Sequence, residues 1–159
     1  MTISKNSNGF TLIELVMVIV ITGVIAVVAI PRFSGRQTFQ ARGFYDQTLS
    51  MLRYAQKIAI AQHTPTFVNV SSVNGTICLT YLSDINCINS DAKQVVLGPS
   101  DQQKFSKVTP NGITIESTNS SFFFSALGKP SPDATVQLSI VGDGMKRIIT
   151  VERETGYVH

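Results

Sequence analysis

The chain has 159 residues, enough for one ordinary domain, and 43% of them are hydrophobic while only 14% are charged. The charged fraction lies below the usual share of about a quarter, which is rare in a soluble cytosolic enzyme, and the apolar content excludes a disordered chain. Two cysteines exclude a disulfide-dense scaffold, and a net charge of +3 is too small to indicate nucleic-acid binding by itself.

The most hydrophobic stretch covers residues 10–30 and holds a single charge, Glu14. As a helix it would be about 31 Å long, the thickness of the hydrocarbon core of a bilayer. A secretory signal peptide fits poorly, because its apolar region is shorter and ends at a small-x-small site, whereas this run is followed by Pro31. We therefore predict that residues 10–30 form the transmembrane half of a helix, preceded by a polar segment over residues 1–9.

Helical patterning continues beyond Pro31 and fades before Pro65. We predict one long helix over residues 10–62, weakened around Gly23 and Pro31, with an amphipathic second half over residues 31–62. Five basic residues against one acid in this half fit a solvated face, lipid headgroups or acidic groups on a neighbouring subunit. The apolar residues expected to share one face are Phe33, Phe39, Leu49, Leu52, Ile58 and Ala59.

After Pro65 the pattern changes to short β-branched and aromatic runs separated by turn residues. Hairpins are expected at Val73-Asn74-Gly75 and Gly142-Asp143-Gly144, while residues 93–101 form a further strand or a loop. The predicted fold class is α+β, a long N-terminal helix packed on an antiparallel β-sheet head over residues 63–159. The expected strands are Thr66–Ser71, Thr76–Ser83, Ile113–Ser117, Ser121–Ser125, Thr135–Val141 and Arg147–Glu152.

The phenylalanines at positions 122–124 lie in one of these expected strands. Because side chains alternate along a strand, we expect burial of Phe123 or of the pair Phe122 and Phe124, but not of all three. A strand core packed on the helix is one interpretation, and a contact with another subunit is the other.

Glu14 is a bare acid near the start of the apolar run, and an acid inside a membrane needs a partner. A cut before Phe10 would create one, because the new α-amino group is positively charged below a pKa of about 8. Glu14 lies one helical turn from Phe10, so it could pair with that amine in its own chain or in a neighbour.

The segment Gly9-Phe10-Thr11-Leu12-Ile13-Glu14, followed by an apolar run and Pro31, resembles the class III signal of type IV pilins and type II secretion pseudopilins. The resemblance implies that a prepilin peptidase cuts between Gly9 and Phe10, removes residues 1–9 as a leader peptide, and methylates the amine of Phe10. It also implies that Glu14 guides docking into a filament by meeting the N-terminus of a neighbouring subunit. In such filaments the helix often melts between the positions held here by Gly23 and Pro31.

Residues 32–62 and the ending ITVERETGYVH are similar to minor pilins with a GspH/FimT-type head, closest to those of the mannose-sensitive haemagglutinin (MSHA) pilus. The resemblance implies a structural, assembly-priming subunit and not an enzyme. Its implied partners are the prepilin peptidase, other pilin subunits, the inner-membrane assembly platform and the lipid bilayer. The implied location is the bacterial inner membrane, with the head in the periplasm, and then the pilus. A minor pseudopilin of type II secretion and a DNA-binding minor pilin for DNA uptake are the alternatives.

Cys78 and Cys87 are expected to form a disulfide if the head lies outside the inner membrane. The alternatives are two free buried thiols or half of a metal site. A metal site needs further ligands, and the sequence offers only His63 and His159 as histidines. We therefore expect no metal and no cofactor.

Catalytic motifs are not found, since the chain has no phosphate-binding glycine loop, no H-E-x-x-H and no G-x-S-x-G. A membrane-anchored envelope enzyme is therefore disfavoured. Lys146, Arg147 and Arg153 could form a small basic patch for DNA. Acids interleave with these residues and weaken the patch as a phosphate-binding surface, so DNA is not an expected partner. The acids are Asp143, Glu152 and Glu154.

Overall fold

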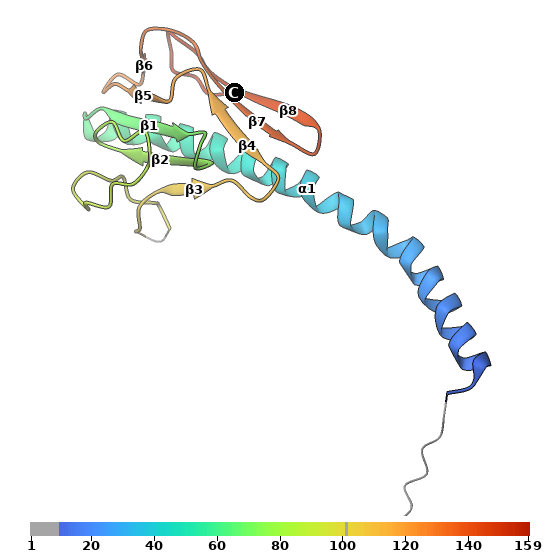
Figure 1. Cartoon of the computed structure of the whole chain (residues 1–159). Coiled ribbons are helices and arrows are strands. Elements are labelled where there is room, and N and C mark those ends of the chain that lie inside the picture. Colours follow the sequence, from blue (N-terminus) through green and yellow to red (C-terminus); the bar gives the residue numbers. More distant parts are fainter. Residues whose placement is uncertain (1–9, 101) are drawn as a thin grey trace, which may run out of the picture. The chain divides into compact units, whose positions relative to one another are not determined.

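The computed structural model describes residues 10–100 and 102–159, without the side chains of residues 28–36. The described residues form one α-helix followed by eight β-strands (Figure 1). A boundary between Arg36 and Gln37 divides the chain into two units, and the second unit contains the rest of the helix and every strand. The expected leader peptide, with Gly9, lies outside the described residues.

Helix α1 (Leu12–Gln62) starts two residues later than predicted and ends where predicted. The end is a Schellman motif, in which the N–H of His63 donates to the carbonyl of Ile60 at 3.4 Å and the N–H of Thr64 to that of Ala59 at 3.3 Å. His63 takes the left-handed conformation, with φ of 51°, that glycine usually supplies there. The helix therefore stops at a defined cap rather than by fraying.

One face of α1 is buried in the second unit, and Phe39 is not part of it. Phe39 is 81% exposed, which contradicts its expected place on the packed face. It lies two residues, or about 200° of rotation, before the buried Ala41, so its side chain leaves the opposite side of the helix. Leu49 and Ile58 are half-buried, and the side chain of Phe33 is not described. The buried residues are Ala41, Phe44, Thr48, Met51, Leu52, Ala55 and Ala59.

The strands form two antiparallel sheets, one in the order β3-β2-β1-β5-β6 and the other in the order β4-β7-β8. All six expected strands are present, Thr66–Ser71 with the predicted bounds and the other five with shifted ends, whereas the two short strands β3 and β6 were not expected. Over the described residues 93–100 there is no strand, only isolated bridges from Val95 to Thr80 and from Leu97 to Lys104. The strands are β1 (Thr66–Ser71), β2 (Thr76–Thr80), β3 (Ser106–Val108), β4 (Thr114–Ser117), β5 (Ser121–Phe124), β6 (Pro130–Ser131), β7 (Val136–Gly142) and β8 (Met145–Val151).

Both expected hairpins form. Asp143 and Gly144 connect β7 to β8 with φ of 55° and 75°, the positive values that a two-residue type I′ turn requires. Gly75 closes the β1–β2 turn with φ of 57°, and a Cβ there would lie only 2.4 Å from Oγ1 of Thr109. Asp143 and Gly144 thus both supply the positive φ that the pattern indicates, whereas in the β1–β2 turn Gly75 alone does so.

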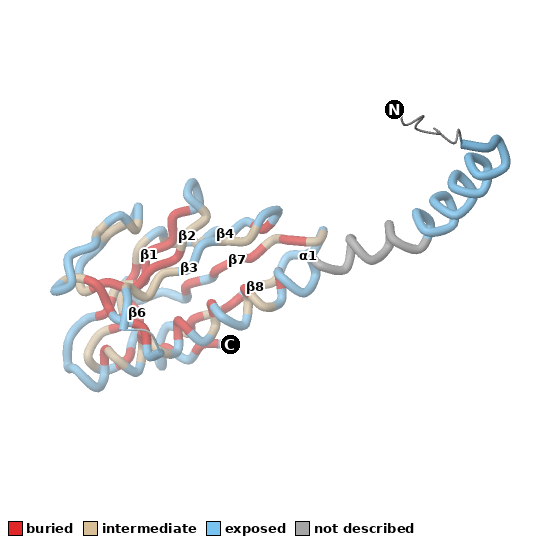
Figure 2. Tube along the Cα trace, turned by 90° about the horizontal axis from the view of Figure 1, so that it is seen from below, coloured by how far each residue is buried: buried red, intermediate tan, exposed pale blue. Residues whose placement is uncertain are grey.

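The core lies between α1 and the inner faces of both sheets, where Figure 2 shows most of the buried backbone. Phe122 and Phe124 point into it, whereas Phe123 is half-buried and packs on Phe67 with ring centroids 5.0 Å apart. The alternation prediction is therefore confirmed for the pair Phe122 and Phe124. The sequence pattern could not say which face would be covered, because that depends on where α1 crosses the strands.

Candidate functional site

The first turn of α1 holds Glu14 in a capping box with Thr11. The backbone N–H of Thr11 and its hydroxyl donate to Oε2 of Glu14 at 3.1 and 2.9 Å, and the N–H of Glu14 donates back to Oγ1 of Thr11 at 3.4 Å. These bonds pair N–H groups that the helix itself cannot satisfy. The carboxylate also lies at the positive end of the helix dipole. Thr11 and Glu14 therefore define the start of the helix.

Thr11 is the residue that sequence reasoning missed. The spacing Thr-x-x-Glu before an apolar run is a sequence signature of a helix start and would have identified it. The expected partner of Glu14 was the amine of Phe10, which exists only after a cut before that residue. Oε2 of Glu14 is occupied in its own turn, and no bond is found for Oε1 among the described residues. One carboxylate oxygen thus remains available for a second partner.

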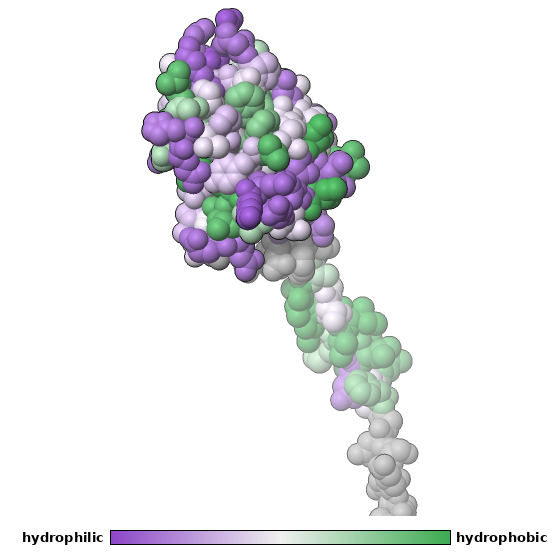
Figure 3. Space-filling model, turned by 90° about the vertical axis from the view of Figure 1, so that its left-hand side faces the viewer, coloured by the Kyte–Doolittle hydropathy of each residue, from purple (hydrophilic) through white to green (hydrophobic). Residues whose placement is uncertain are grey.

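Apolar side chains surround Glu14 on every side of the helix. Figure 3 shows hydrophobic residues covering this part of α1, with few hydrophilic ones among them. A helix that is apolar all round is covered by lipid or by other protein. No helix in the part of the chain with described side chains is long and apolar enough to cross a membrane. The exposed large apolar residues are Phe10, Leu12, Ile13, Leu15, Val16, Met17, Val18, Ile19, Val20, Ile21, Val24, Ile25 and Val27.

The two positions expected to weaken the helix both lie within the bounds of α1. A Cβ added at Gly23 would meet nothing within 4 Å, so no packing in the chain requires a glycine there. The hydroxyl of Thr22 donates to the carbonyls of Val18 and Ile19 at 2.6 and 3.0 Å, a pattern that often bends helices. The side chain of Pro31 is outside the described residues. Melting between Gly23 and Pro31 stays a prediction.

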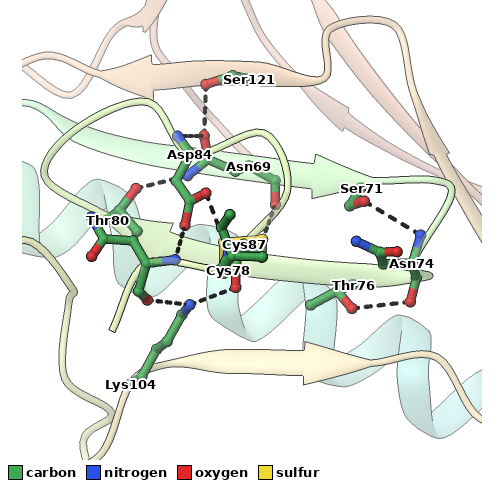
Figure 4. Close-up of a disulfide and its surroundings, with 12 residues drawn as sticks. Asn69, Ser71, Asn74, Thr76, Cys78, Thr80, Asp84, Cys87, Lys104 and Ser121 are labelled. Atoms are coloured by element: carbon green, nitrogen blue, oxygen red, sulfur yellow. Dashed lines mark hydrogen bonds between the residues drawn. A yellow bond between two sulfur atoms is a disulfide. The ribbon is translucent and has the colours of Figure 1, made fainter. Parts of the chain in front are cut away.

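Cys78 and Cys87 form the expected disulfide. Cys78 is fully buried in β2, and Cys87 lies in the loop that follows the strand. The ammonium group of Lys104 donates to the carbonyls of Cys87 and Asn89 at 2.6 and 2.5 Å, as Figure 4 shows. The bridge and this lysine hold the loop from two sides.

Asn69 anchors the same loop from inside the sheet (Figure 4). It is fully buried in β1, and its Oδ1 accepts the N–H of Asp84 at 3.0 Å and the hydroxyl of Ser121 at 2.7 Å. Its Nδ2 donates to Oγ1 of Thr80 at 2.7 Å. A buried amide with its polar atoms paired ties β1, β2 and β5 to the disulfide loop.

The basic residues near the C-terminus do not form an open patch. Arg147 makes a two-bond contact with Asp143, at 3.1 Å for each bond, and Arg153 does the same with Asp133 at 3.1 and 3.0 Å. These carboxylates raise the pKa of both guanidinium groups and neutralise their charge locally. Only Lys146 of the three expected cations makes no ion pair in the described part of the chain.

The two histidines lie at the end of α1 and at position 159. His63 caps the end of α1, and His159 places Nε2 3.0 Å from Oε1 of Glu152 while its ring stacks on Tyr157. Within the described residues, no group of histidine, cysteine, aspartate and glutamate side chains is arranged to hold a metal ion.

Comparison with known proteins gives a motif and a fold. A family model described as the prokaryotic N-terminal methylation motif matches residues 4–30. No curated protein matches the chain. Among solved structures, the chain is similar to the type IV minor pilin FimU of Pseudomonas aeruginosa, with a TM-score of 0.52 and 13% identity over 79% of this chain and 87% of that one. It is also similar to the minor pseudopilin EpsH of the type 2 secretion system of Vibrio cholerae, with a TM-score of 0.53 and 14% identity over 77% of this chain and 94% of that one.

These similarities confirm the predicted fold class, an α+β pilin-like fold in which an N-terminal helix packs on antiparallel sheets. The matched motif covers Gly9, Phe10, Glu14 and Gly23, so the residues expected to act in processing and docking fall inside it.

Proposed function

We propose that this chain is a minor pilin or minor pseudopilin, a structural subunit of an envelope filament that catalyses no reaction. It is made as a prepilin, cut between Gly9 and Phe10 by a prepilin peptidase, and methylated at the amine of Phe10. Residues 10–30 anchor it in the inner membrane with the head outside the cytoplasm. Other pilin subunits and the inner-membrane assembly platform are its partners.

The observation that carries the proposal is the position of Glu14. The methylation motif covers residues 4–30, and the capping box holds the carboxylate four residues after the expected new N-terminus. The carboxylate is fixed in a helix start that is otherwise covered by apolar side chains. It can pair with the amine of a neighbouring subunit, and such a charge pair is strong in a medium of low dielectric constant. The pilin-like fold of the head supports the same conclusion.

For the finer assignment, we propose a subunit that primes assembly of an MSHA-like pilus, on the basis of the sequence resemblance of residues 32–62 and of the C-terminal end. The similarity to EpsH supports the alternative of a type II secretion pseudopilin. A DNA-uptake role is disfavoured, because Arg147 and Arg153 are engaged with carboxylates.

Intact-mass measurement of the protein from a membrane fraction of its native host tests the proposal. We expect the loss of residues 1–9, with or without one added methyl group. An uncut chain, or a cut after the apolar run, would contradict it. A Gly9→Val variant is the control, because a bulky residue at the cut should leave the full-length mass.

The location of the mature protein separates the two filament systems. A pilus subunit should be present in filaments sheared from the cell surface, whereas a pseudopilin should stay in the cell envelope. Detection only in the envelope fraction, in cells that display pili, would overturn the MSHA-like assignment and leave the wider proposal intact.

A further inference from the structure

Three turns of the head lie together beside the first turns of α1 in the second unit (Figure 1). The N–H of Thr109, in the β3–β4 loop, donates to the carbonyl of Gly75 in the β1–β2 turn at 2.7 Å. A Cβ at Gly112 would lie 3.2 Å from Nε2 of Gln37. A Cβ at Gly142, beside the β7–β8 turn, would lie 3.0 Å from Cβ of Ala41. We call residues 37–42, 72–75, 107–112 and 142–146 the turn end of the head.

Each segment of the turn end carries a large exposed apolar side chain. The exposed fractions are 81% for Phe39, 96% for Val73, 67% for Val108 and 59% for Met145. Phe39 and Val108 also line one shallow groove between α1 and β3, together with Pro110. Single exposed apolar residues are ordinary, but four at one end, from four separate segments, indicate a contact surface.

The same end carries cations without partners. Arg42, Lys107 and Lys146 are exposed and form no ion pair in the part of the chain that the structure describes. The carboxylate of Asp143 is held by Arg147. Asp46, one helical turn beyond Arg42, is the exposed acid nearest to them along the helix. The turn end therefore combines apolar tips with an excess of positive charge.

We propose that the turn end docks on the surface of a bilayer that contains anionic phospholipids, an inference that rests on the proposed membrane anchor. The apolar tips enter the boundary between headgroups and acyl chains, and the three cations meet phosphate groups. Isolated apolar tips surrounded by bare cations suit a lipid interface better than a protein partner, whose contact surface is usually continuous and depleted of lysine.

Chain connectivity favours this contact. Residues 28–36 of α1 join its apolar part to the head. A segment of that length spans at most about 30 Å even if its backbone were fully extended. An anchored chain therefore keeps its own head at a high effective concentration beside the membrane, so a weak interaction suffices for docking. Docking would orient the head before the subunit enters a filament.

Fluorescence of the full chain in vesicles tests the proposal. An environment-sensitive probe is attached at Val108→Cys in the turn end, or at Leu127→Cys in the β5–β6 loop, where Leu127 is 83% exposed. The two native cysteines are consumed in the disulfide, so only the new thiol reacts. In vesicles of phosphatidylglycerol and phosphatidylcholine, we expect a several-fold brighter, blue-shifted emission at position 108 and a water-like emission at position 127.

Charge variants test the electrostatic part. We expect three variants each to lower the ratio of docked to undocked heads by roughly fivefold: Arg42→Gln, Lys107→Gln and Lys146→Gln. The reason is that each cation near an anionic surface contributes about 1 kcal/mol of attraction, which corresponds to roughly fivefold in that ratio. Lys93→Gln removes an exposed cation from the loop after the disulfide and is the matched control, for which we expect no change. Vesicles of phosphatidylcholine alone remove the attraction for all three cations at once, so they should reduce the emission at position 108 more than any single variant does.

Flotation of the same samples distinguishes docking from anchoring. If the chain floats with vesicles of either composition but positions 108 and 127 give equal emission, the docking proposal is overturned and the anchor stands. If the chain floats with neither, both proposals fail. If the signal at position 108 disappears at one chain per vesicle, the turn end contacts a second copy rather than lipid, and the docking proposal is overturned.

Discussion

Glu14 accepts two hydrogen bonds within its own helical turn. Thr11 supplies a backbone N–H and a hydroxyl, so the carboxylate is already oriented before any second subunit arrives. An oriented acid loses less side-chain freedom when it binds a partner than a freely rotating one does. The capping box is thus compatible with the proposed docking role and prepares the side chain for it.

We predict that Glu14→Ala inserts into the membrane normally but enters filaments poorly. Removing an acid from an apolar segment lowers the cost of insertion, by less than about 3 kcal/mol near the membrane edge. The same change removes the charge that would meet a neighbouring amine. Thr11→Ala is the control, because it keeps the charge and costs only about 1 kcal/mol of helix capping. Flotation measures insertion and sheared-filament content measures incorporation; normal incorporation of Glu14→Ala would refute the docking role.

Asn69 is the second residue whose role depends on its neighbours. We predict that Asn69→Ala lowers the free energy of unfolding by about 1–3 kcal/mol, because it leaves the N–H of Asp84 without its partner and removes one hydrogen bond each from the hydroxyls of Thr80 and Ser121. Asn74→Ala is the matched control, since only backbone atoms of Asn74 form the bonds of its exposed turn. Chemical denaturation measures both, and equal stability of the two variants would contradict the prediction.

At the scale of elements, the β7–β8 hairpin is closed by its own turn and by an ion pair. Asp143 is in the turn, its side chain is only 7% exposed, and Arg147 holds it with two bonds. The hydrogen bonds from Arg147, aided by one from Thr38 in α1, lower the pKa of Asp143 below the ordinary range of an aspartate. The hairpin is therefore connected to α1 as well as to itself.

Because folding lowers the pKa of Asp143, its unfolded form binds a proton more readily than its folded form. The stabilisation is complete above the ordinary aspartate pKa of about 3.9 and is lost as the pH falls through the lower folded value. We predict that Asp143→Asn lowers the free energy of unfolding at neutral pH. It should also make the loss of stability below about pH 4 less steep. Asp133→Asn, at an exposed pair, should change the curve less. Parallel acid-unfolding curves for wild type and Asp143→Asn would refute this.

At the scale of the whole molecule, side chains of α1 hold the C-terminal segment in place. The guanidinium of Arg53 donates twice to the carbonyl of Val158, at 3.2 and 3.1 Å. Nε2 of Gln56 donates to the carbonyls of Gly128 and Thr155, both at 3.0 Å. One helix face thus joins the β5–β6 loop to residues at the end of the chain.

Gly156 lies at the centre of this junction. We predict that Gly156→Ala costs clearly more than Gly144→Ala, although both glycines have positive φ, of 66° and 75°. A Cβ at Gly156 would lie 2.0 Å from the carbonyl oxygen of Gly128, whereas one at Gly144 meets nothing within 4 Å. The control should cost about 1–2 kcal/mol of backbone strain, and the clash at Gly156 adds to that. Equal thermal midpoints for the two variants would show that the C-terminal segment moves aside.

Local patterns in the sequence were sufficient to predict the helix, both hairpins and the fold class. The hydrophobic period and the turn residues are local properties of the sequence. Gly75, Asp143 and Gly144 could therefore be identified as turn residues before any contact was known. With only two cysteines, Cys78 could pair only with Cys87, and the prediction that they pair depended on a head outside the inner membrane. The Thr11–Glu14 capping box is equally local, and its Thr-x-x-Glu spacing was available in the sequence.

Only the tertiary structure decided which side of each element is covered. Phe39 looked like a core residue by spacing but is exposed, because the sheets cover the opposite side of α1, the side of Ala41. The burial of Asn69 and the clustering of the turn end depend on contacts between residues far apart in the sequence, which no local pattern encodes. Sequence alone predicted the helix, six of the eight described strands and the segment that the methylation motif matches. Packing determined which side chains face solvent, because burial depends on the neighbours that folding brings together.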